Sequence, residues 1–138
     1  MNTPSPVALL INIDVPDLAA AVRFYEAATG LRLNRRLFGG SVAEMRGAAV
    51  PVYLLEKPEG SGAGPHVPQN RGYARHWTPL HLDFVVEDLD AAVANAIAAG
   101  ATLETGPTLH AWGYIATLGD PFGHGLCFLQ WTGQGYEP

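Results

Sequence analysis

Polar side chains alternate with apolar ones along two short, otherwise apolar segments of the sequence. Asn12 and Asp14 lie two residues apart in the first segment, and His81 and Asp83 have the same spacing in the second. Because successive side chains of a β-strand point to opposite faces, each pair is expected on one face of a strand. An amide and two carboxylates would offer hydrogen bonds and negative charge there. A histidine could bind a metal ion or move a proton.

The elements that must position these pairs occur twice in the chain. Val15 and Asp17 recur as Val86 and Asp88, and an alanine-rich segment that ends at a glycine follows in both copies. An aspartate N-cap and a glycine after the last turn are typical of a helix. Short β-prone segments separated by turn residues surround each helix. We expect strands over 9–15, 31–38, 42–46, 50–56, 80–86, 102–110, 114–118 and 126–131.

Each copy therefore predicts a βαβββ module, and two such modules define a fold of the α+β class. A unit of about 50 residues buries little surface alone, so we expect the modules to pair, with curved mixed sheets around a cavity and the helices on the outer face. The predicted single domain covers 1–138, with module 1 at about 7–57, a connection at 58–78 and module 2 at about 79–132. A Gly- and Pro-rich connection of this length is either a linker or a lid.

Composition and charge exclude several classes of function. The 138 residues carry 8 Lys and Arg against 13 Asp and Glu, a net charge of −5, whereas proteins that bind nucleic acids are normally basic. A single cysteine excludes an internal disulfide and a four-cysteine zinc site. No segment has the roughly 20 apolar residues of a membrane helix, or the pattern of a secretion signal. We therefore expect a cytoplasmic protein whose partner is a small molecule rather than nucleic acid or a membrane.

Three short motifs add a family resemblance. Val-Pro-Asp-Leu at 15–18, Phe-Tyr at 24–25 and Asp-Pro-Phe-Gly at 120–123, together with the paired βαβββ pattern, resemble the vicinal oxygen chelate superfamily. That superfamily includes glyoxalase I, the bleomycin-resistance binding proteins, the fosfomycin-resistance transferases and the extradiol dioxygenases. One scaffold hosts many chemistries, so the resemblance implies the fold and leaves the function open. We expect a homodimer, with the modules paired within one chain or exchanged between two.

The resemblance also implies where a metal ion would be held. In metal-using members, the first and last strands of each module supply one ligand each, and by spacing these positions here are Leu10, Tyr53, His81 and Cys127. Leucine cannot ligate a metal ion and tyrosine is a poor substitute, so we expect no metal or other cofactor. The alternative is one divalent metal ion bound by His81 and Glu56, which requires a bulge to turn Glu56 inward.

A cavity without a metal ion can still bind a ligand, because aromatic residues are plentiful on the strands expected to line it. The expected flat walls are formed by Phe38, Tyr53, Trp77, Trp112 and Tyr114, and carboxylates beside them would suit a planar or cationic ligand. The predicted ligand-binding residues are Asn12, Asp14, Phe38, Tyr53, His81, Asp83, Trp112, Tyr114 and Cys127.

Three functions follow, and the sequence does not decide whether the protein is an enzyme. The first is a small-molecule binding protein of the bleomycin-resistance type, which sequesters an aromatic or cationic ligand, such as an antibiotic, without a metal ion. The second is a metal-dependent, glyoxalase-like lyase or isomerase, or a dioxygenase, with His81 as a ligand. The third is metal-free acid–base catalysis by His81, oriented by Asp83.

Overall fold

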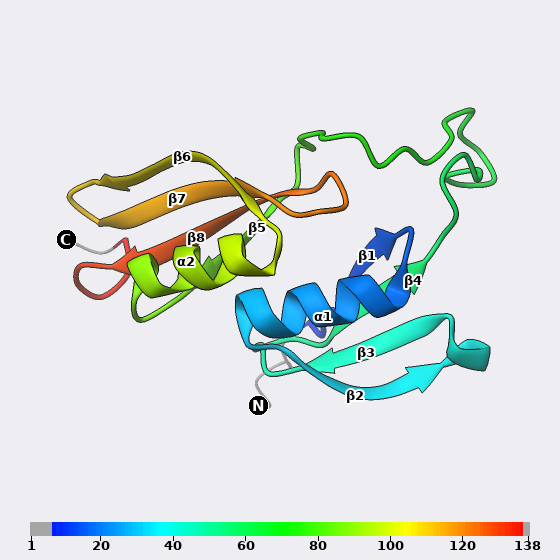
Figure 1. The fold of residues 1–138 in the computed structure, drawn as a ribbon, viewed down its shortest axis with the longest axis horizontal. Helices are drawn as coiled ribbons and strands as arrows, with labels where there is room; N and C mark the ends of the chain where they lie inside the picture. The colour runs from blue at the N-terminus through cyan, green and yellow to red at the C-terminus, as the bar shows by residue number, and fades with distance from the viewer. Residues whose placement is uncertain (1–6, 137–138) are drawn as a thin grey trace, which may run out of the picture.

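The computed structural model describes residues 7–136 as two βαβββ modules joined by a long connection (Figure 1). The ends of the predicted domain, 1–6 and 137–138, lie outside the described residues. The elements of module 1 are β1 (Ile11–Val15), α1 (Leu18–Thr29), β2 (Arg32–Leu37), η1 (Phe38–Gly40), β3 (Val42–Arg46) and β4 (Val52–Glu56). Those of module 2 are β5 (Leu82–Val85), α2 (Leu89–Ala99), β6 (Thr102–Leu109), β7 (Gly113–Gly119) and β8 (Gly125–Trp131).

Each module has its own four-stranded mixed sheet. The strand orders are β1-β4-β3-β2 and β5-β8-β7-β6, with the first and last strands of each module parallel and the other pairs antiparallel. The predicted α+β fold of two paired modules with mixed sheets is therefore confirmed. The opening strands are shorter than expected, because β1 begins at Ile11 and β5 at Leu82. Leu10 and His81 accordingly lie just before their strands.

The two helices are capped in the same way at their N-termini. Asp17 accepts a hydrogen bond from the N–H of Ala20, and Asp88 accepts one from the N–H of Ala91. The last strand of each module supplies a second acceptor. Glu56 Oε2 lies 2.9 Å from the N–H of Leu18. Gln130 Oε1 lies 2.8 Å from the N–H of Leu89. The repeat therefore includes a capping side chain at the end of β4 and another at the end of β8. Such acceptors are needed because the first N–H groups of a helix have no partner within the helix.

The core lies between each helix and its sheet. Apolar residues of α1 pack on one face of β3 and β4, where Ala43, Met45, Val52 and Leu54 are almost fully buried. The equivalent residues of module 2 are Ala116, Leu118, Leu126 and Phe128. The helices α1 and α2 lie side by side on the same side of the molecule (Figure 1). Because successive side chains of a strand point to opposite faces, the residues that alternate with these buried ones lie on the face of each sheet away from the helix.

The connection between β4 and β5 is tied to the rest of the protein at several points, although it contains no named helix or strand. Tyr73 donates a hydrogen bond to the carbonyl of Lys57, and the N–H of His76 donates one to the carbonyl of Gly123. Within residues 7–136, no helix is long and apolar enough to cross a membrane.

Candidate functional site

A row of polar side chains crosses the sheet of module 1 on the face opposite α1. Asn12 on β1 is in register with Tyr53 on β4. Tyr53 is in register with Glu44 on β3, and Glu44 with Arg35 on β2. Ala43 and Met45, the neighbours of Glu44 along β3, lie in the core beneath α1. Because successive side chains of a strand point to opposite faces, the polar row faces away from the helix. The structure thus places Asn12 and Tyr53 on one continuous polar surface.

Glu44 is a buried charge at the centre of this row. Its side chain is 1% exposed, and it pairs with Arg35 and Arg46 at 3.1 and 3.3 Å. The Tyr53 hydroxyl donates to Glu44 Oε2 at 3.1 Å. The hydrogen bonds from Arg35, then those from Asn34 and Tyr53, lower the pKa of Glu44 to about 2. The carboxylate is therefore ionised at every physiological pH.

Module 2 has an equivalent row of different chemistry. Asp83 on β5 is in register with Cys127 on β8, and Cys127 with Thr117 on β7. The Thr117 hydroxyl lies 3.4 Å from the Cys127 sulfur. Burial is the main cause that raises the pKa of the Cys127 thiol. The thiol is therefore protonated at neutral pH, and it is not activated as a nucleophile.

His81 joins this second row. Its Nε2 lies 3.3 Å from Asp83 Oδ1, and the donor atoms of His81, Asp83 and Cys127 all lie within 4.8 Å of one another. The indole of Trp77 covers the His81 ring at a centroid distance of 4.5 Å. Two chemistries fit this cluster. Asp83 can orient His81 for proton transfer, or the imidazole, the carboxylate and the sulfur can converge on one metal ion.

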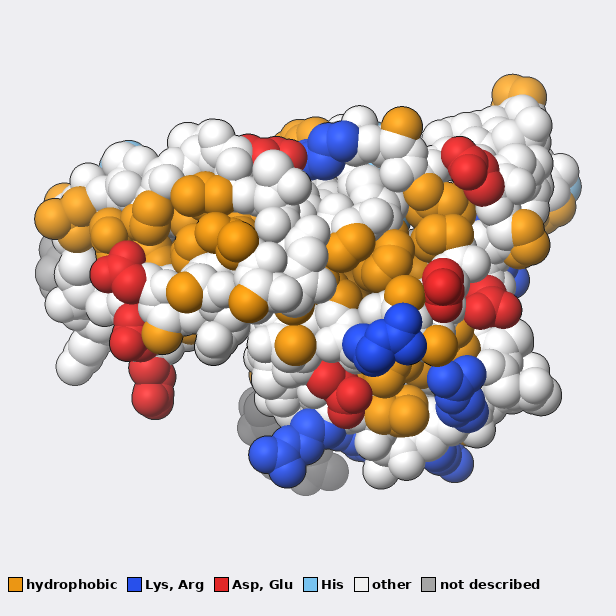
Figure 2. Space-filling view, viewed as in Figure 1, with side chains coloured by type: hydrophobic (Ala, Val, Ile, Leu, Met, Phe, Trp, Pro, Cys, Tyr) orange, Lys and Arg blue, Asp and Glu red, His pale blue; other side chains and the backbone are white. Residues whose placement is uncertain are grey.

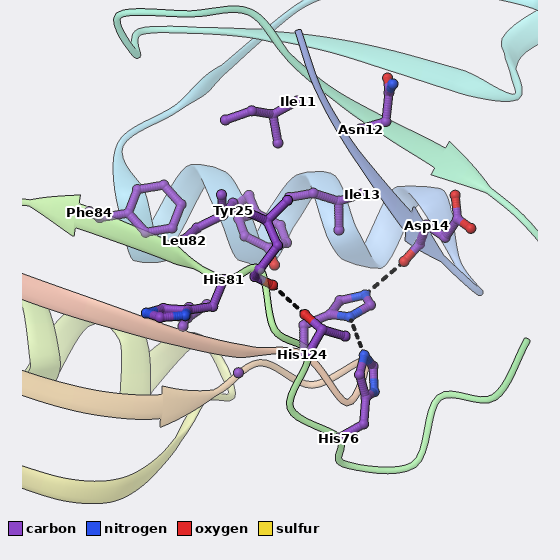
Figure 3. A pocket seen from close by; sticks show the side chains of 14 residues that line it. Ile11, Asn12, Ile13, Asp14, Tyr25, His76, His81, Leu82, Phe84 and His124 are labelled. Atoms are coloured by element: carbon purple, nitrogen blue, oxygen red, sulfur yellow. Dashed lines mark hydrogen bonds between the residues drawn. The ribbon is translucent and has the colours of Figure 1, made fainter. Parts of the chain in front are cut away.

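A pocket of about 350 Å³ opens between the edges of β1 and β5. Ile11, Ile13 and Phe84 extend toward this space, and Asn12 projects from the other face of β1 (Figure 3). The connection reaches the rim through His76, Thr78 and Leu80. Of the predicted ligand-binding residues, the structure brings Asn12, Asp14 and His81 to this one pocket.

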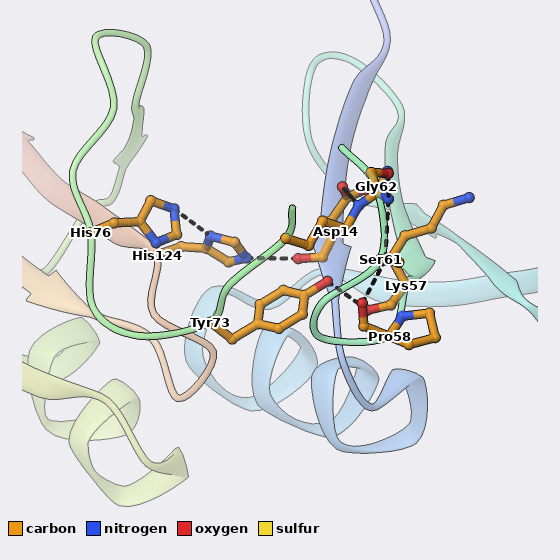
Figure 4. A network of polar contacts seen from close by, with 9 residues as sticks. Asp14, Lys57, Pro58, Ser61, Gly62, Tyr73, His76 and His124 are labelled. Atoms are coloured by element: carbon orange, nitrogen blue, oxygen red, sulfur yellow. Dashed lines mark hydrogen bonds and ion pairs between the residues drawn. The ribbon is translucent and has the colours of Figure 1, made fainter. Parts of the chain in front are cut away.

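Polar contacts tie the connection to the pocket rim. Arg71 Nε lies 2.7 Å from Asp14 Oδ2. His124 Nε2 lies 2.7 Å from the carbonyl oxygen of Asp14, so this nitrogen carries the proton and donates. His124 Nδ1 faces His76 Nε2 at 3.4 Å, and this chain links β1, the turn before β8 and the connection (Figure 4). The Asp14 carboxylate, expected to attract a cationic ligand, already has a cationic partner.

The four metal-ligand positions that the resemblance implies do not form a cage. Leu10 offers no donor and is 61% exposed, and the Tyr53 hydroxyl is bound to Glu44. Glu56, the alternative partner of His81, lies on the helix side, where it caps α1. No bulge turns it inward, because β4 is in unbroken register with both neighbours. A metal ion would instead fit the donors of module 2, which are His81, Asp83 and Cys127.

The predicted aromatic walls do not meet at the pocket. Phe38 is 80% exposed at the β2–β3 turn. Trp112 stacks on His110 at 4.9 Å, beyond the pocket-lining set. The Tyr114 hydroxyl contacts Asp90 on α2, so this ring lies on the helix side of its sheet. Trp77 reaches the pocket rim through its contact with the His81 ring.

Sequence reasoning missed several residues of the site. Glu44 and Arg46 lie on β3, and their spacing of two residues, with apolar Ala43 and Met45 on the other face, indicates that this part of the face is polar. His124 and His76 come from a turn and from the connection, where no periodicity indicates which way a side chain points. Their contact with each other depends on the path of the connection.

Comparisons with known proteins agree with this architecture. The profile of the glyoxalase-like domain family matches residues 10–129, so the chain belongs to that family and to the vicinal oxygen chelate superfamily. A curated relative from Mycobacterium tuberculosis, CFP32, which is provisionally named a glyoxylase, is 36% identical over 112 residues. That match covers 80% of this chain and 38% of the relative, so the chain spans about two fifths of that protein's length.

Solved structures share the fold at low sequence identity. TnmS3, an antibiotic binding protein from Streptomyces sp. CB03234, has a TM-score of 0.64 and 23% identity, over 95% of this chain and 100% of that one. A glyoxalase/bleomycin resistance protein/dioxygenase from Nocardioides has a TM-score of 0.66 and 18% identity, over 99% and 91% of the two chains. These likenesses establish the arrangement of the modules and not the ligand.

Proposed function

We propose that the protein binds a small aromatic molecule, such as an antibiotic, in the pocket between its modules and sequesters it without a metal ion. The observation that carries this proposal is the pocket itself. Its volume of about 350 Å³ suits a small organic ligand. Its wall is apolar at Ile11, Ile13 and Phe84, with a polar rim. An apolar wall with a few polar groups holds such a ligand by burial and orients it by hydrogen bonds.

The charges around the pocket favour an aromatic ligand over a cationic one. Both carboxylates expected to attract a cation have partners, since Asp14 pairs with the Arg71 guanidinium and Asp83 Oδ1 lies 3.3 Å from the His81 imidazole. A cation would have to compete with these partners. The fold shared with an antibiotic binding protein is consistent with a sequestering role.

The proposal is tested by titrating the protein with an anthracycline, a quinolone and a cationic glycopeptide. Binding is followed by calorimetry and by tryptophan fluorescence, because Trp77 contacts His81 at the pocket. Leu80→Glu places a charge at the rim on a residue that is 83% exposed, and Leu109→Glu is its control on β6, at 69% exposed. We expect Leu80→Glu to weaken binding about tenfold and Leu109→Glu to leave it unchanged. No saturable response to any of the three compounds would refute the proposal.

A metal-dependent reaction is the second candidate, and one observation favours it. The donors of His81, Asp83 and Cys127 lie within 4.8 Å of one another on the polar face of module 2. A bound metal ion would supply Lewis-acid polarisation of a substrate oxygen. The chain's own contribution would be to hold that ion at one edge of the pocket, where His81 is already positioned by Trp77.

A further inference from the structure

The cationic side chains of the protein are distributed very unevenly between its modules. All 8 Lys and Arg residues precede position 76, and the segment 79–132 contains none. The space-filling view shows the same asymmetry, with most blue side chains over the part of the molecule that contains α1, β2 and β3 (Figure 2). Since acidic residues occur in both modules, module 1 is close to neutral and module 2 is strongly acidic, so an anionic group would be disfavoured at module 2 and tolerated at module 1.

The arginines on the polar face of module 1 outnumber the carboxylate that holds them. Arg35 and Arg46 both pair with Glu44, and Arg32 lies opposite Arg46 in the strand register. One bidentate arginine is enough to neutralise a carboxylate, and Arg35 already makes two hydrogen bonds to Glu44, through Nε and Nη2. The second arginine gives the cluster a net positive charge.

The geometry leaves this charge available. The Arg35 and Arg46 side chains are 61% and 58% exposed, whereas Glu44 is 1% exposed because the side chains of its own donors cover it. A guanidinium has five N–H donors, and Arg46 directs only Nη2 to Glu44. Glu44 therefore fixes one side of each guanidinium and leaves other donors directed to solvent.

We propose that this Glu44-held arginine pair is a binding site for an oxyanion, either the carboxylate or the phosphate group of a small molecule. An arginine that is already immobilised loses less side-chain entropy on binding than a free one, and its planar fork matches an oxyanion. The Tyr53 hydroxyl lies at the same carboxylate and adds a polar group beside the arginines.

A row of side chains leads from the arginine pair to the pocket edge at β1. Asn12 is among the residues around the pocket, but its side chain projects from the face of β1 opposite to Ile11 and Ile13, which is the polar face that also carries Tyr53 and Glu44. Adjacent strands lie about 4.8 Å apart, so the row from β1 to β2 is about 14 Å long. A ligand that reaches around the edge strand β1 can place an aromatic body in the pocket and an anionic group toward the arginines. This joint binding rests on the proposed function, whereas binding of the oxyanion itself does not.

The site is tested first with inorganic phosphate at constant ionic strength, by following the arginine Nε–H signals in NMR spectra. Arg46→Gln removes the second cation and leaves the Arg35–Glu44 pair that keeps the buried carboxylate satisfied. The control is Arg36→Gln, because Arg36 bonds only the carbonyl of Gly40 among the described residues. We expect saturable shifts that Arg46→Gln weakens about tenfold and Arg36→Gln leaves unchanged. Absence of saturable shifts, or equal losses in both variants, overturns the proposal.

A second pair of probes separates this site from the pocket. We expect 1-naphthoate to bind more tightly than its neutral amide, and Arg46→Gln to remove the difference. Equal binding of the two probes, with phosphate still bound specifically, would refute the joint ligand and keep the oxyanion site. Failure of both naphthyl probes to bind would count against the pocket proposal, while the phosphate result would stand independently.

Discussion

The Tyr25 hydroxyl donates a 2.6 Å hydrogen bond to Asp120 Oδ2, and this buried contact joins α1 of module 1 to the turn before β8 of module 2. The other carboxylate oxygen of Asp120 accepts from the N–H groups of Phe122 and His124, both at 2.8 Å. Burial and the nearby carboxylate raise the pKa of Tyr25 well above its usual value. Asp120 therefore shapes the turn and holds the two modules together.

Removing this hydroxyl is expected to destabilise the protein. In Tyr25→Phe, one oxygen of a buried carboxylate loses its donor, which we expect to lower the free energy of unfolding by about 2 kcal/mol. Urea denaturation followed by circular dichroism measures this loss. Tyr114→Phe is the matched control, because its hydroxyl bonds Asp90 at an exposed position. Equal losses in the two variants would show that the buried Tyr25–Asp120 hydrogen bond stabilises the protein no more than the exposed Tyr114–Asp90 hydrogen bond does.

The sequence was sufficient to predict the fold because local signals agreed with the repeat. Both helices begin after an aspartate N-cap and end at a glycine C-cap, as expected. Alternation correctly separated Ile11 and Ile13, which pack against the core, from Asn12 on the other face. These features depend only on residues close in sequence, which is why sequence patterns report them.

The composition of the site was harder to predict because it depends on contacts between distant strands. Glu44 is held by Arg35 and Tyr53 only because three strands share one register. Strand alternation could have corrected the expectation for Tyr114, since Ala116 and Leu118 on the same face of β7 are buried under α2. The position of the connection, and hence of His76, leaves no such pattern in the sequence.

Acid is expected to remove the contribution of Glu44 to stability. The pKa of this carboxyl is about 2 in the folded protein, from a usual value of 4.5. A carboxyl with a depressed folded pKa binds its proton more readily in the unfolded chain. Its stabilisation is therefore complete above about pH 4.5 and is lost as the pH falls toward 2.

Comparing urea midpoints of the wild-type protein and Glu44→Gln across this pH range measures the effect. We expect the difference between the two proteins to be largest near neutral pH and to shrink steadily below about pH 4.5. Asp17→Asn provides the control for an acidic side chain of module 1, at an exposed N-cap. A difference between wild type and Glu44→Gln that is constant with pH would contradict the assigned ionisation.

The Cys127 cluster makes a prediction that separates the two candidate functions. If His81, Asp83 and Cys127 bind a metal ion, cadmium should give a sulfur-to-metal charge-transfer band in the ultraviolet. Binding should also release a proton, because burial keeps the Cys127 thiol protonated in the metal-free protein. Cys127→Ser should abolish the band and Asp83→Asn should weaken binding about tenfold or more. His110→Ala, distant from the cluster, is the control.

A cadmium titration without this band would rule out the three-residue metal site and with it the structural basis of the metal-dependent alternative. The same thiol should react slowly with iodoacetamide in the folded protein and quickly in urea, since the side chain is buried and protonated. Fast modification of the folded protein would contradict both the burial and the assigned protonation state.

The ion pair between Arg71 and Asp14 is expected to hold the connection against the pocket. Arg71 is mostly covered, with its side chain 18% exposed, and the pair joins the connection to β1 at 2.7 Å. Asp14→Asn keeps the shape of the side chain and removes its charge. Because Asp14 is partly exposed, we expect a loss of about 1 kcal/mol, which raises the open population of the connection about fivefold. Tryptic cleavage after Arg71 and Arg75, followed by mass spectrometry, should accelerate to the same extent.

The control variant is Asp90→Asn, which changes a carboxylate on α2, far from the connection, and should leave the cleavage rate unchanged. Equal cleavage rates in Asp14→Asn and the wild type would mean that other contacts, such as Tyr73 with Lys57, determine the position of the connection.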